Sequence, residues 1–312
     1  MAVSGSKNYS ITRADIIESA LRKSGAYDQG EAVSGSETVA ADIALNLMVK
    51  FFVTQGADLW LRDEIILFLQ PDQQSYLLGT ANATRTITGE TTLSAAEASG
   101  QTVISVTSST GMTAADIVGI KIDDNTIHWT TIVSVDSSTQ ITITVATDGA
   151  AASGNKVYAY TTTAGRPTKI VSAYRRDIND IDTMVRTIGE TEYRYQSNKG
   201  SSGPPVEVWY QPTLTTGTLY VWPVNGGSNV DKIILSAQYY PDDFDAASDN
   251  PQFPIEWGEP LVYGLADRLA PEYGLPLNER LLLKQEANSK LQDALDYDVE
   301  NASVIFSMDN PR

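Results

Sequence analysis

The chain has 312 residues, of which 42% are hydrophobic and 20% charged, and this length predicts two or three folding units with adequate cores. Its 22 Lys and Arg against 39 Asp and Glu leave a formal net charge of −17, so the surface repels nucleic-acid backbones instead of gripping them. The absence of cysteine excludes disulfides, thiolate nucleophiles and Cys-based zinc sites; without a membrane-length apolar run or a secretory signal, we expect a soluble chain with no membrane partner.

Residues 1–79 are predicted to form the N-terminal helical part of the protein. Apolar residues recur at three- and four-residue spacing in two stretches, which favours two helices. The first stretch contains Ile16, Ile17, Ala20 and Leu21, and the second contains Val39, Ile43, Leu47, Val49, Phe52 and Val53. Ser10 or Thr12 is a suitable N-cap for the first helix, and Ser36 with Glu37 marks a start for the second. A buried strand is expected over residues 65–69, closed by Pro71.

Residues 80–165 differ sharply in composition and are predicted to form an inserted all-β domain. Thr, Ser, Ala, Gly and Val dominate this segment, and helical periodicity is lost. Alternating runs predict strands at 102–106, 117–122, 127–135, 140–145 and 156–160. Short strands separated by turns at regular intervals favour a small sandwich or barrel.

The rest of the chain is predicted to complete an α+β protein with a helical core. Residues 166–250 form its β-rich part, with strands expected at 169–174, 192–196, 206–211, 218–222 and 232–239. Residues 251–312 form a helical hairpin: one helix carries Leu261, Leu265 and Leu269, and the other starts near Asn278. The segment from Gly274 to Pro276 separates the two helices.

Residues that could carry chemistry are few, and we expect no catalytic, cofactor or metal site. His128 is the only histidine, and its place in an alternating strand favours a structural or exposed role. Carboxylate groups at 123–124, 177–182, 190–192 and 242–245 lack the spacing of a calcium loop, and they lie where turns are expected. The glycine-rich loop at 198–203 lacks the order of a phosphate-binding loop.

Basic and aromatic residues have an ordinary structural explanation as well. The doublets Arg22-Lys23 and Arg175-Arg176 are isolated and are typical of surface ion pairs, with a nucleic-acid or acidic partner as the alternative. Aromatic residues lie beside prolines at strand ends, at 209–212, 219–223 and 238–241. They are expected to fill a core, with subunit contacts as the alternative.

The joint order of these packing residues resembles the head-to-tail adaptor family of short-tailed bacteriophages, also called packaged-DNA stabilisation or head completion proteins. The resemblance lies in residues 16–25, 37–52, 56–60 and 76–79 for the N-terminal half, and in 253–257, 265–274 and 303–306 for the C-terminal helices. The inserted β-domain, with residues 119–120 and 127–131, is similar to that of longer members. These residues are packing residues and not a chemical signature.

The resemblance implies a structural protein of the virion at the head-tail interface, assembled in the host cytoplasm and without a cofactor or a shared catalytic centre. Members form a ring, commonly of twelve copies, beneath the portal protein. The ring closes the filled head, offers a platform for the tail nozzle, hub or fibres, and lets double-stranded DNA pass without sequence-specific binding. By this resemblance, the last helix and the apolar C-terminal segment are expected to bind the portal. The residues concerned are Leu291, Leu295, Val299, Val304, Ile305, Phe306 and Met308.

The β-insert is expected to point outward and to meet tail or fibre proteins through His128 and Trp129. Two other functions remain open. One is a tail-associated cell-wall hydrolase that uses a carboxylate pair. The other is a carbohydrate- or surface-binding module centred on Trp129 of the β-insert.

Overall fold

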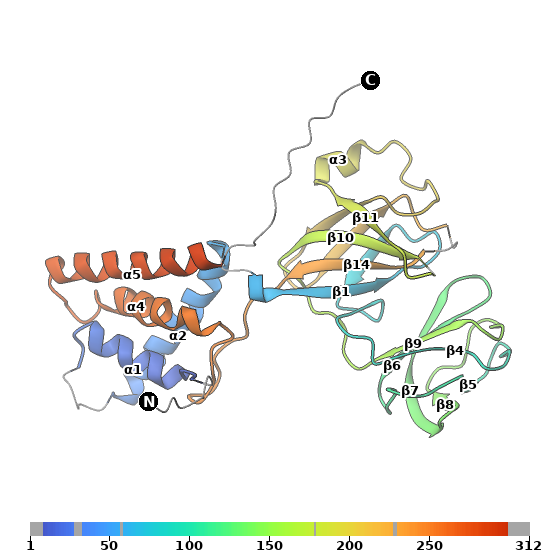
Figure 1. Cartoon of the computed structure of the whole chain (residues 1–312), viewed down its shortest axis with the longest axis horizontal. Coiled ribbons are helices and arrows are strands. Elements are labelled where there is room, and N and C mark those ends of the chain that lie inside the picture. The colour runs from blue at the N-terminus through green and yellow to red at the C-terminus, as the bar shows by residue number, and fades with distance from the viewer. Residues whose placement is uncertain (1–8, 28–32, 57–58, 178, 227–229, 299–312) are drawn as a thin grey trace, which may run out of the picture. The chain divides into compact units, whose positions relative to one another are not determined.

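The computed structural model describes residues 9–27, 33–56, 59–177, 179–226 and 230–298. The chain divides into two compact units, one made of residues 1–61 with 240–312 and the other of residues 62–239. The first is mainly helical and the second mainly β, as the ribbon in Figure 1 shows. The predicted α+β class is therefore confirmed.

Four helices build the helical unit, together with the 3-10 turns Leu59–Leu61 and Ile255–Trp257. They are α1 (Arg13–Lys23), α2 (Gly35–Thr54), α4 (Gly258–Leu269) and α5 (Leu277–Tyr297). Helix α4 packs against each of the other three. The predicted cap of α1 is confirmed, because the Thr12 hydroxyl accepts a hydrogen bond from Asp15 N and the Asp15 carboxylate accepts one from Thr12 N. The predicted start of α2 at Ser36 is wrong by two residues, because Ser34 is its N-cap.

Aromatic rings and a glycine hold the helical core together. Trp257 is 2% exposed, and its ring centroid lies 5.8 Å from that of Phe52 and 5.0 Å from that of Trp60. Tilted ring pairs at this separation are favourable beyond the area that they bury. A Cβ at Gly264 of α4 would lie 2.9 Å from Met48 Sδ. The glycine therefore lets α2 approach α4 closely.

The β unit contains an eight-stranded sheet in the order β2-β13-β12-β11-β10-β14-β1-β3. Its strands are β1 (Arg62–Phe68), β2 (Ser75–Leu78), β3 (Ala83–Thr84), β10 (Lys169–Asp177), β11 (Asp182–Thr187), β12 (Glu207–Pro212), β13 (Gly217–Trp222) and β14 (Val230–Gln238). The strand predicted at 192–196 is instead the end of helix α3 (Glu190–Tyr195), with Gln196 as its C-cap. That prediction was wrong because the Glu192 carboxylate accepts a hydrogen bond from Gly189 N and Arg194 pairs with Glu190 one turn away, and both contacts favour a helix.

The inserted segment forms a second, six-stranded sheet in the order β4-β9-β6-β7-β8-β5. Its strands are β4 (Gly89–Thr92), β5 (Val103–Ser105), β6 (Ile117–Lys121), β7 (Ile127–Ser137), β8 (Gln140–Ile143) and β9 (Lys156–Tyr160). The two outer strands are joined as well, because Thr107 N donates to Thr92 O at 2.8 Å and Leu93 bridges Val106. The predicted sandwich or barrel is therefore a small barrel.

Phe68 of β1 and the aromatic residues of the barrel pack together in one buried cluster. The Phe68 ring centroid lies 4.7 Å from that of Tyr158 and 5.1 Å from that of Trp129. Beside them, Lys232 Nζ of β14 lies 2.9 Å from Glu90 Oε2 of β4 and 4.7 Å from the Tyr158 ring centroid. These contacts join the barrel to the eight-stranded sheet within the β unit.

Candidate functional site

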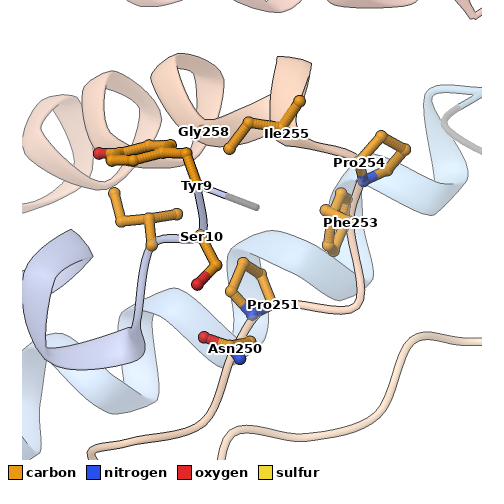
Figure 2. A pocket seen from close by; sticks show the side chains of 9 residues that line it. Tyr9, Ser10, Asn250, Pro251, Phe253, Pro254, Ile255 and Gly258 are labelled. Atoms are coloured by element: carbon orange, nitrogen blue, oxygen red, sulfur yellow. The ribbon is translucent and has the colours of Figure 1, made fainter. Parts of the chain in front are cut away.

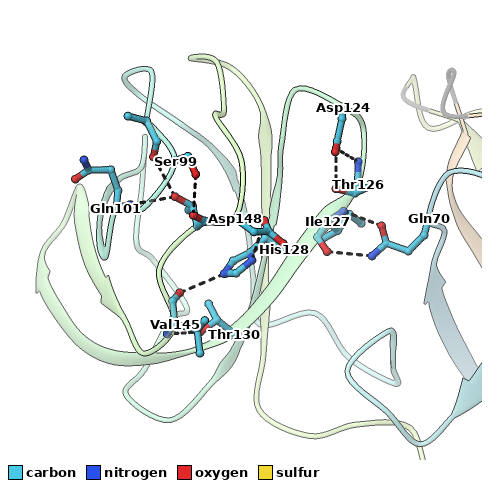
Figure 3. Close-up of polar contacts among 12 residues, drawn as sticks. Gln70, Ser99, Gln101, Asp124, Thr126, Ile127, His128, Thr130, Val145 and Asp148 are labelled. Atoms are coloured by element: carbon cyan, nitrogen blue, oxygen red, sulfur yellow. Dashed lines mark hydrogen bonds and ion pairs between the residues drawn. The ribbon is translucent and has the colours of Figure 1, made fainter.

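His128 is held inside the barrel, with both of its ring nitrogens in polar contacts. It is 7% exposed; its Nδ1 lies 3.0 Å from Asp148 Oδ1 and its Nε2 3.2 Å from Val145 O. Figure 3 shows the ring between these two partners, beside the strand that also carries Thr130. The arrangement fixes the segment 145–148 to β7, which is a structural role. Contact of His128 with a tail protein remains a prediction.

Trp129 faces the other side of the same strand and packs against aromatic rings. Its ring centroid lies 5.7 Å from that of Tyr160, and a Cβ at Gly119 would lie 2.5 Å from its ring. Gly119 of the neighbouring strand β6 therefore leaves the space that the indole occupies. Next to it, the Gln70 side chain both donates to Ile127 O and accepts from Ile127 N (Figure 3). Trp129 is thus a partly buried packing residue of the barrel.

Of the carboxylates with possible acid-base chemistry, several lie in turns or ion pairs, and Glu192 caps helix α3. A hydrogen bond from Arg176 lowers the pKa of Asp182, and a backbone hydrogen bond from Ile181 lowers that of Asp177. Hydrogen bonds from Thr126 lower the pKa of Asp124. A glycoside hydrolase needs one carboxyl group with a raised pKa as its acid, and the pKa of each of these three carboxyl groups is lowered instead. Among the residues that the structure describes, no group of three or more metal-binding side chains is found.

Both basic doublets make local contacts. Arg22 pairs with Glu18 one turn earlier, and Lys23 Nζ lies 4.2 Å from the Tyr263 ring centroid. Arg176 holds Asp182 through two hydrogen bonds of 2.8 and 2.9 Å, whereas Arg175 donates to a backbone carbonyl. The structure thus gives each doublet a structural partner.

Two of the aromatic stretches, 209–212 and 219–223, contribute to one aromatic cluster in the β unit. Trp209 and Tyr193 are buried, and the Trp209 and Tyr220 rings are stacked with centroids 4.6 Å apart. The expected core-filling role is confirmed for Trp209. Tyr240, from another stretch, is exposed.

The predicted portal-binding residues are only partly within the described chain. Leu291 and Leu295 of α5 are partly buried and pack against the helical core. Val299, Val304, Ile305, Phe306 and Met308 lie outside the described residues. The described part of α5 also carries three exposed leucines near its start, Leu277, Leu281 and Leu282.

Helix α2 has its apolar residues on both sides. The buried side consists of Ala41, Leu45, Met48, Val49, Phe52 and Val53. Three residues that were predicted to mark the helix by their apolar spacing, Val39, Ile43 and Leu47, are instead exposed, as is Phe51. Apolar residues lie on two sides of α2, with Asp42, Asn46 and Lys50 between them along one flank, so apolar spacing alone does not select the inner face. A continuous run of exposed large apolar residues is typical of an interaction surface, so the exposed side of α2 is a candidate binding surface.

Among the depressions of the described helical unit, two are lined by polar and apolar residues in about equal measure. One has a volume of about 90 Å³ and is lined by Tyr9, Phe253 and Ile255 together with neighbouring residues; Figure 2 shows Pro251 and Pro254 along the loop before α4. The other, of about 130 Å³, is lined by Phe51 and Met48 of α2, Arg268 of α4 and Leu291 of α5. Arg268 lies over the Phe51 ring, 5.6 Å from its centroid, and its burial lowers the pKa of the guanidinium. Phe51 therefore joins the exposed side of α2 to this second depression.

Comparisons with known proteins identify no relative by sequence. No protein-family model matches the chain, and no curated protein matches it. Among solved structures, the chain is similar to VP17, a capsid protein of bacteriophage P23-77, with 11% sequence identity, a TM-score of 0.12, and coverage of 60% of this chain and 76% of that one. A TM-score this low does not indicate a common fold. Separately, none of the described helices has a stretch long and apolar enough to cross a membrane.

Proposed function

We propose that this protein is a structural component of a phage virion, a head-to-tail adaptor that assembles as a ring beneath the portal and carries the tail, with no enzymatic role. The observation that carries the proposal is the helical unit, whose helix α2 presents an uncharged apolar side outward. A surface of this kind is typical of a protein that is completed by assembly. The sequence resemblance to the adaptor family supplies the kind of assembly.

The distribution of charge supports a DNA channel in that ring. The helical unit has 10 Lys and Arg against 22 Asp and Glu, a formal −12, whereas the β unit has 12 against 17, a formal −5. An acidic surface repels phosphates, so double-stranded DNA would pass it without sticking. We therefore propose that the helical unit contributes more than the β unit to the channel side.

Portal binding is assigned to α5 and to the chain that follows it. We expect that a chain ending after Glu300 is a folded, soluble monomer when dilute and no longer shifts the portal ring of the same phage on a native gel. A full-length chain with Phe306→Ser and Ile305→Ser is the second variant, because it keeps the length and removes only apolar side chains. Normal portal binding by both variants contradicts the assignment. Imaging the protein with and without the portal ring tests the ring itself.

Tail attachment is assigned to the barrel. Thr84 bridges Thr163, and Ala164 N donates to Ala83 O at 2.9 Å, so residues 85–162 leave and re-enter the eight-stranded sheet side by side. A variant in which a short turn replaces residues 85–162 should keep portal binding and lose tail attachment. It also carries Phe68→Thr, because removal of the barrel would otherwise expose the Phe68 ring. A variant that still assembles tailed particles contradicts this part of the proposal.

A further inference from the structure

The exposed side of α2 carries four large apolar residues that follow one another along the helix. Val39, Ile43, Leu47 and Phe51 are 61%, 59%, 63% and 48% exposed. We call these four residues the α2 stripe. They are spaced four residues apart, and residues four apart are neighbours on a helix surface. The stripe is therefore a continuous ridge about 18 Å long, at a rise of about 1.5 Å per residue.

A second apolar patch lies at the start of α5. Leu277, Leu281 and Leu282 are 66%, 59% and 63% exposed, and we call them the leucine patch. Helices α2 and α5 each pack against α4. The two patches therefore belong to the same folded unit but to different helices.

The two patches match in size. Burying an apolar side chain removes on the order of 100 Å² from water, so the stripe offers on the order of 300–400 Å² and the leucine patch a similar amount. Together they supply roughly 700 Å² of apolar area, and a specific interface that is a little over half apolar then totals about 1,200 Å². That total reaches the lower end of stable protein interfaces.

We infer that the α2 stripe of one copy is covered by the leucine patch of a second copy of this chain. Contact between two stripes would be symmetric and would leave the leucine patch in water on both copies. In a contact between stripe and leucine patch, each copy binds one neighbour through its stripe and the other neighbour through its leucine patch. Both patches of a copy that has two neighbours are then covered. A ridge of residues four apart also packs readily against a similar ridge, with the helices crossing at about 50°.

The rim of the leucine patch carries charges of both signs: Arg280 and Lys284 lie beside Leu281, and Glu279 and Glu286 lie beside Leu282. Glu37 precedes the stripe on α2, and Arg280 and Lys284 are the rim cations that can face it. Neither Arg280 nor Lys284 makes an ion pair with any residue in the described part of the chain. Complementary charges at the rim orient an interface and favour the matching partner.

A contact of this kind joins different surfaces of successive copies, and such contacts generate closed rings when the rotation closes. Only the closure of the ring depends on the proposed function of the protein. The contact itself depends on the two patches, so it can fail while portal binding persists, or hold while portal binding fails.

The natural absence of cysteine makes the contact directly testable by cross-linking. Leu47→Cys and Leu281→Cys are made in separate full-length chains, mixed at high concentration and treated with a short bis-maleimide. The mixture should yield at least ten times more cross-linked dimer than either variant alone. Ala14→Cys on α1 and Asp293→Cys on α5, both at exposed positions, are the matched controls and should not cross-link. As much dimer from Leu47→Cys alone as from the mixture shows a symmetric contact instead and overturns the inference, as does the absence of any dimer.

A second measurement tests whether the chain's own C-terminal segment is the occupant. The rate at which a maleimide labels Leu47→Cys is compared in the full chain and in a chain that ends after Glu300. If the contact is between copies, labelling should slow at least several-fold as the protein concentration rises, and equally in both chains. A rate that rises several-fold on truncation and does not depend on concentration assigns the stripe to the tail and overturns the inference.

Discussion

The barrel and the helical unit place their apolar side chains differently. In the barrel, leucine, isoleucine and methionine side chains such as Leu93, Ile104 and Ile120 point inward, and the large apolar residues exposed in its described part are the valines Val103, Val133, Val135 and Val145. In the helical unit, isoleucine, leucine and phenylalanine are exposed in two continuous patches on α2 and α5. The barrel is closed by its own residues, whereas the helical unit leaves a continuous apolar surface exposed.

The surfaces between those apolar residues differ as well. On the barrel, threonines of neighbouring strands are paired by hydrogen bonds, as between Thr92 and Thr107 at 3.0 Å and between Thr131 and Thr144 at 2.8 Å. Such cross-strand pairs stabilise a sheet without a partner. The outer side of α2 has no comparable polar network. Exposure alone therefore does not identify a binding surface. The exposed threonines of the barrel are already hydrogen-bonded to each other, whereas the exposed side chains of α2 are apolar and lose contact with water only when another surface covers them.

The largest expected effect tests whether the helical unit has a firm core of its own beneath its apolar surface. Trp257→Ala removes a buried ring that contacts Phe52, Trp60 and Phe253, and it should lower the free energy of unfolding by about 3–5 kcal/mol. Ile120→Ala in the barrel is the counterpart and should cost about 2–5 kcal/mol. Urea denaturation followed by circular dichroism measures both. A loss below about 1 kcal/mol for Trp257→Ala means that the helical unit lacks a packed core, and the comparison then fails.

The next effect concerns the ion pair beside the barrel. Burial alone would raise the pKa of Glu90, but the hydrogen bond and charge of Lys232, with Lys156, outweigh it and lower the pKa below its ordinary 4.5. Lys232 is only 9% exposed and Glu90 is 36% exposed, so Glu90→Gln should cost about 1–2 kcal/mol at pH 7 after allowance for solvent screening.

Acid should remove the same stabilisation. A carboxylate with a lowered folded pKa stabilises the protein fully above its unfolded value, and the contribution is lost as the pH falls below about 4.5 through the folded pKa. Glu90→Gln should therefore lose less stability between pH 7 and pH 3 than the natural chain does. Lys156→Met, which removes the more distant and exposed cation, should cost about 0.5 kcal/mol and serves as the control. Equal acid sensitivity of the natural chain and Glu90→Gln contradicts the role of this pair.

A smaller effect tests the start of the helical unit. The Thr12 hydroxyl caps α1 and also contacts the Asp15 carboxylate, and its hydrogen bonds lower the pKa of Asp15. Thr12→Ala should lower the free energy of unfolding by about 1 kcal/mol, whereas Thr12→Ser should be nearly neutral because it keeps the hydroxyl. Thermal unfolding of the two variants side by side measures the difference. Equal losses in both would mean that the methyl group, and not the cap, matters.

Much of the element order could be predicted, because hydrophobic spacing and turn residues are local signals. The strand predicted at 156–160 coincides with β9, and the helix predicted from near Asn278 begins at Leu277. Where local signals conflict, prediction fails. Residues 192–196 alternate as a strand would, yet the contacts of Glu192 and Arg194 favour the helix α3.

The candidate surface was harder to predict, for a physical reason. The buried side of α2 is set by its packing against α4, where Gly264 leaves space for Met48. The sequence of α2 by itself does not show which of its sides faces α4. The contact of His128 with Asp148 and the joining of β4 to β5 are likewise pairings between segments apart in the chain. The apolar character of both sides of α2 was present in the sequence and could have pointed to a binding surface.

The smallest expected effect sharpens the comparison most, because it separates the two sides of one helix. Ile43→Ser on the α2 stripe should change the free energy of unfolding of the dilute protein by less than about 0.5 kcal/mol, since an exposed side chain is in water before and after folding. Leu45→Ala, two residues away and fully buried, should cost about 2–5 kcal/mol. Both are measured by urea denaturation at a concentration where the chain is monomeric. If Ile43→Ser costs as much as Leu45→Ala, the stripe is already covered within a single chain, and the helical unit is then as closed as the barrel.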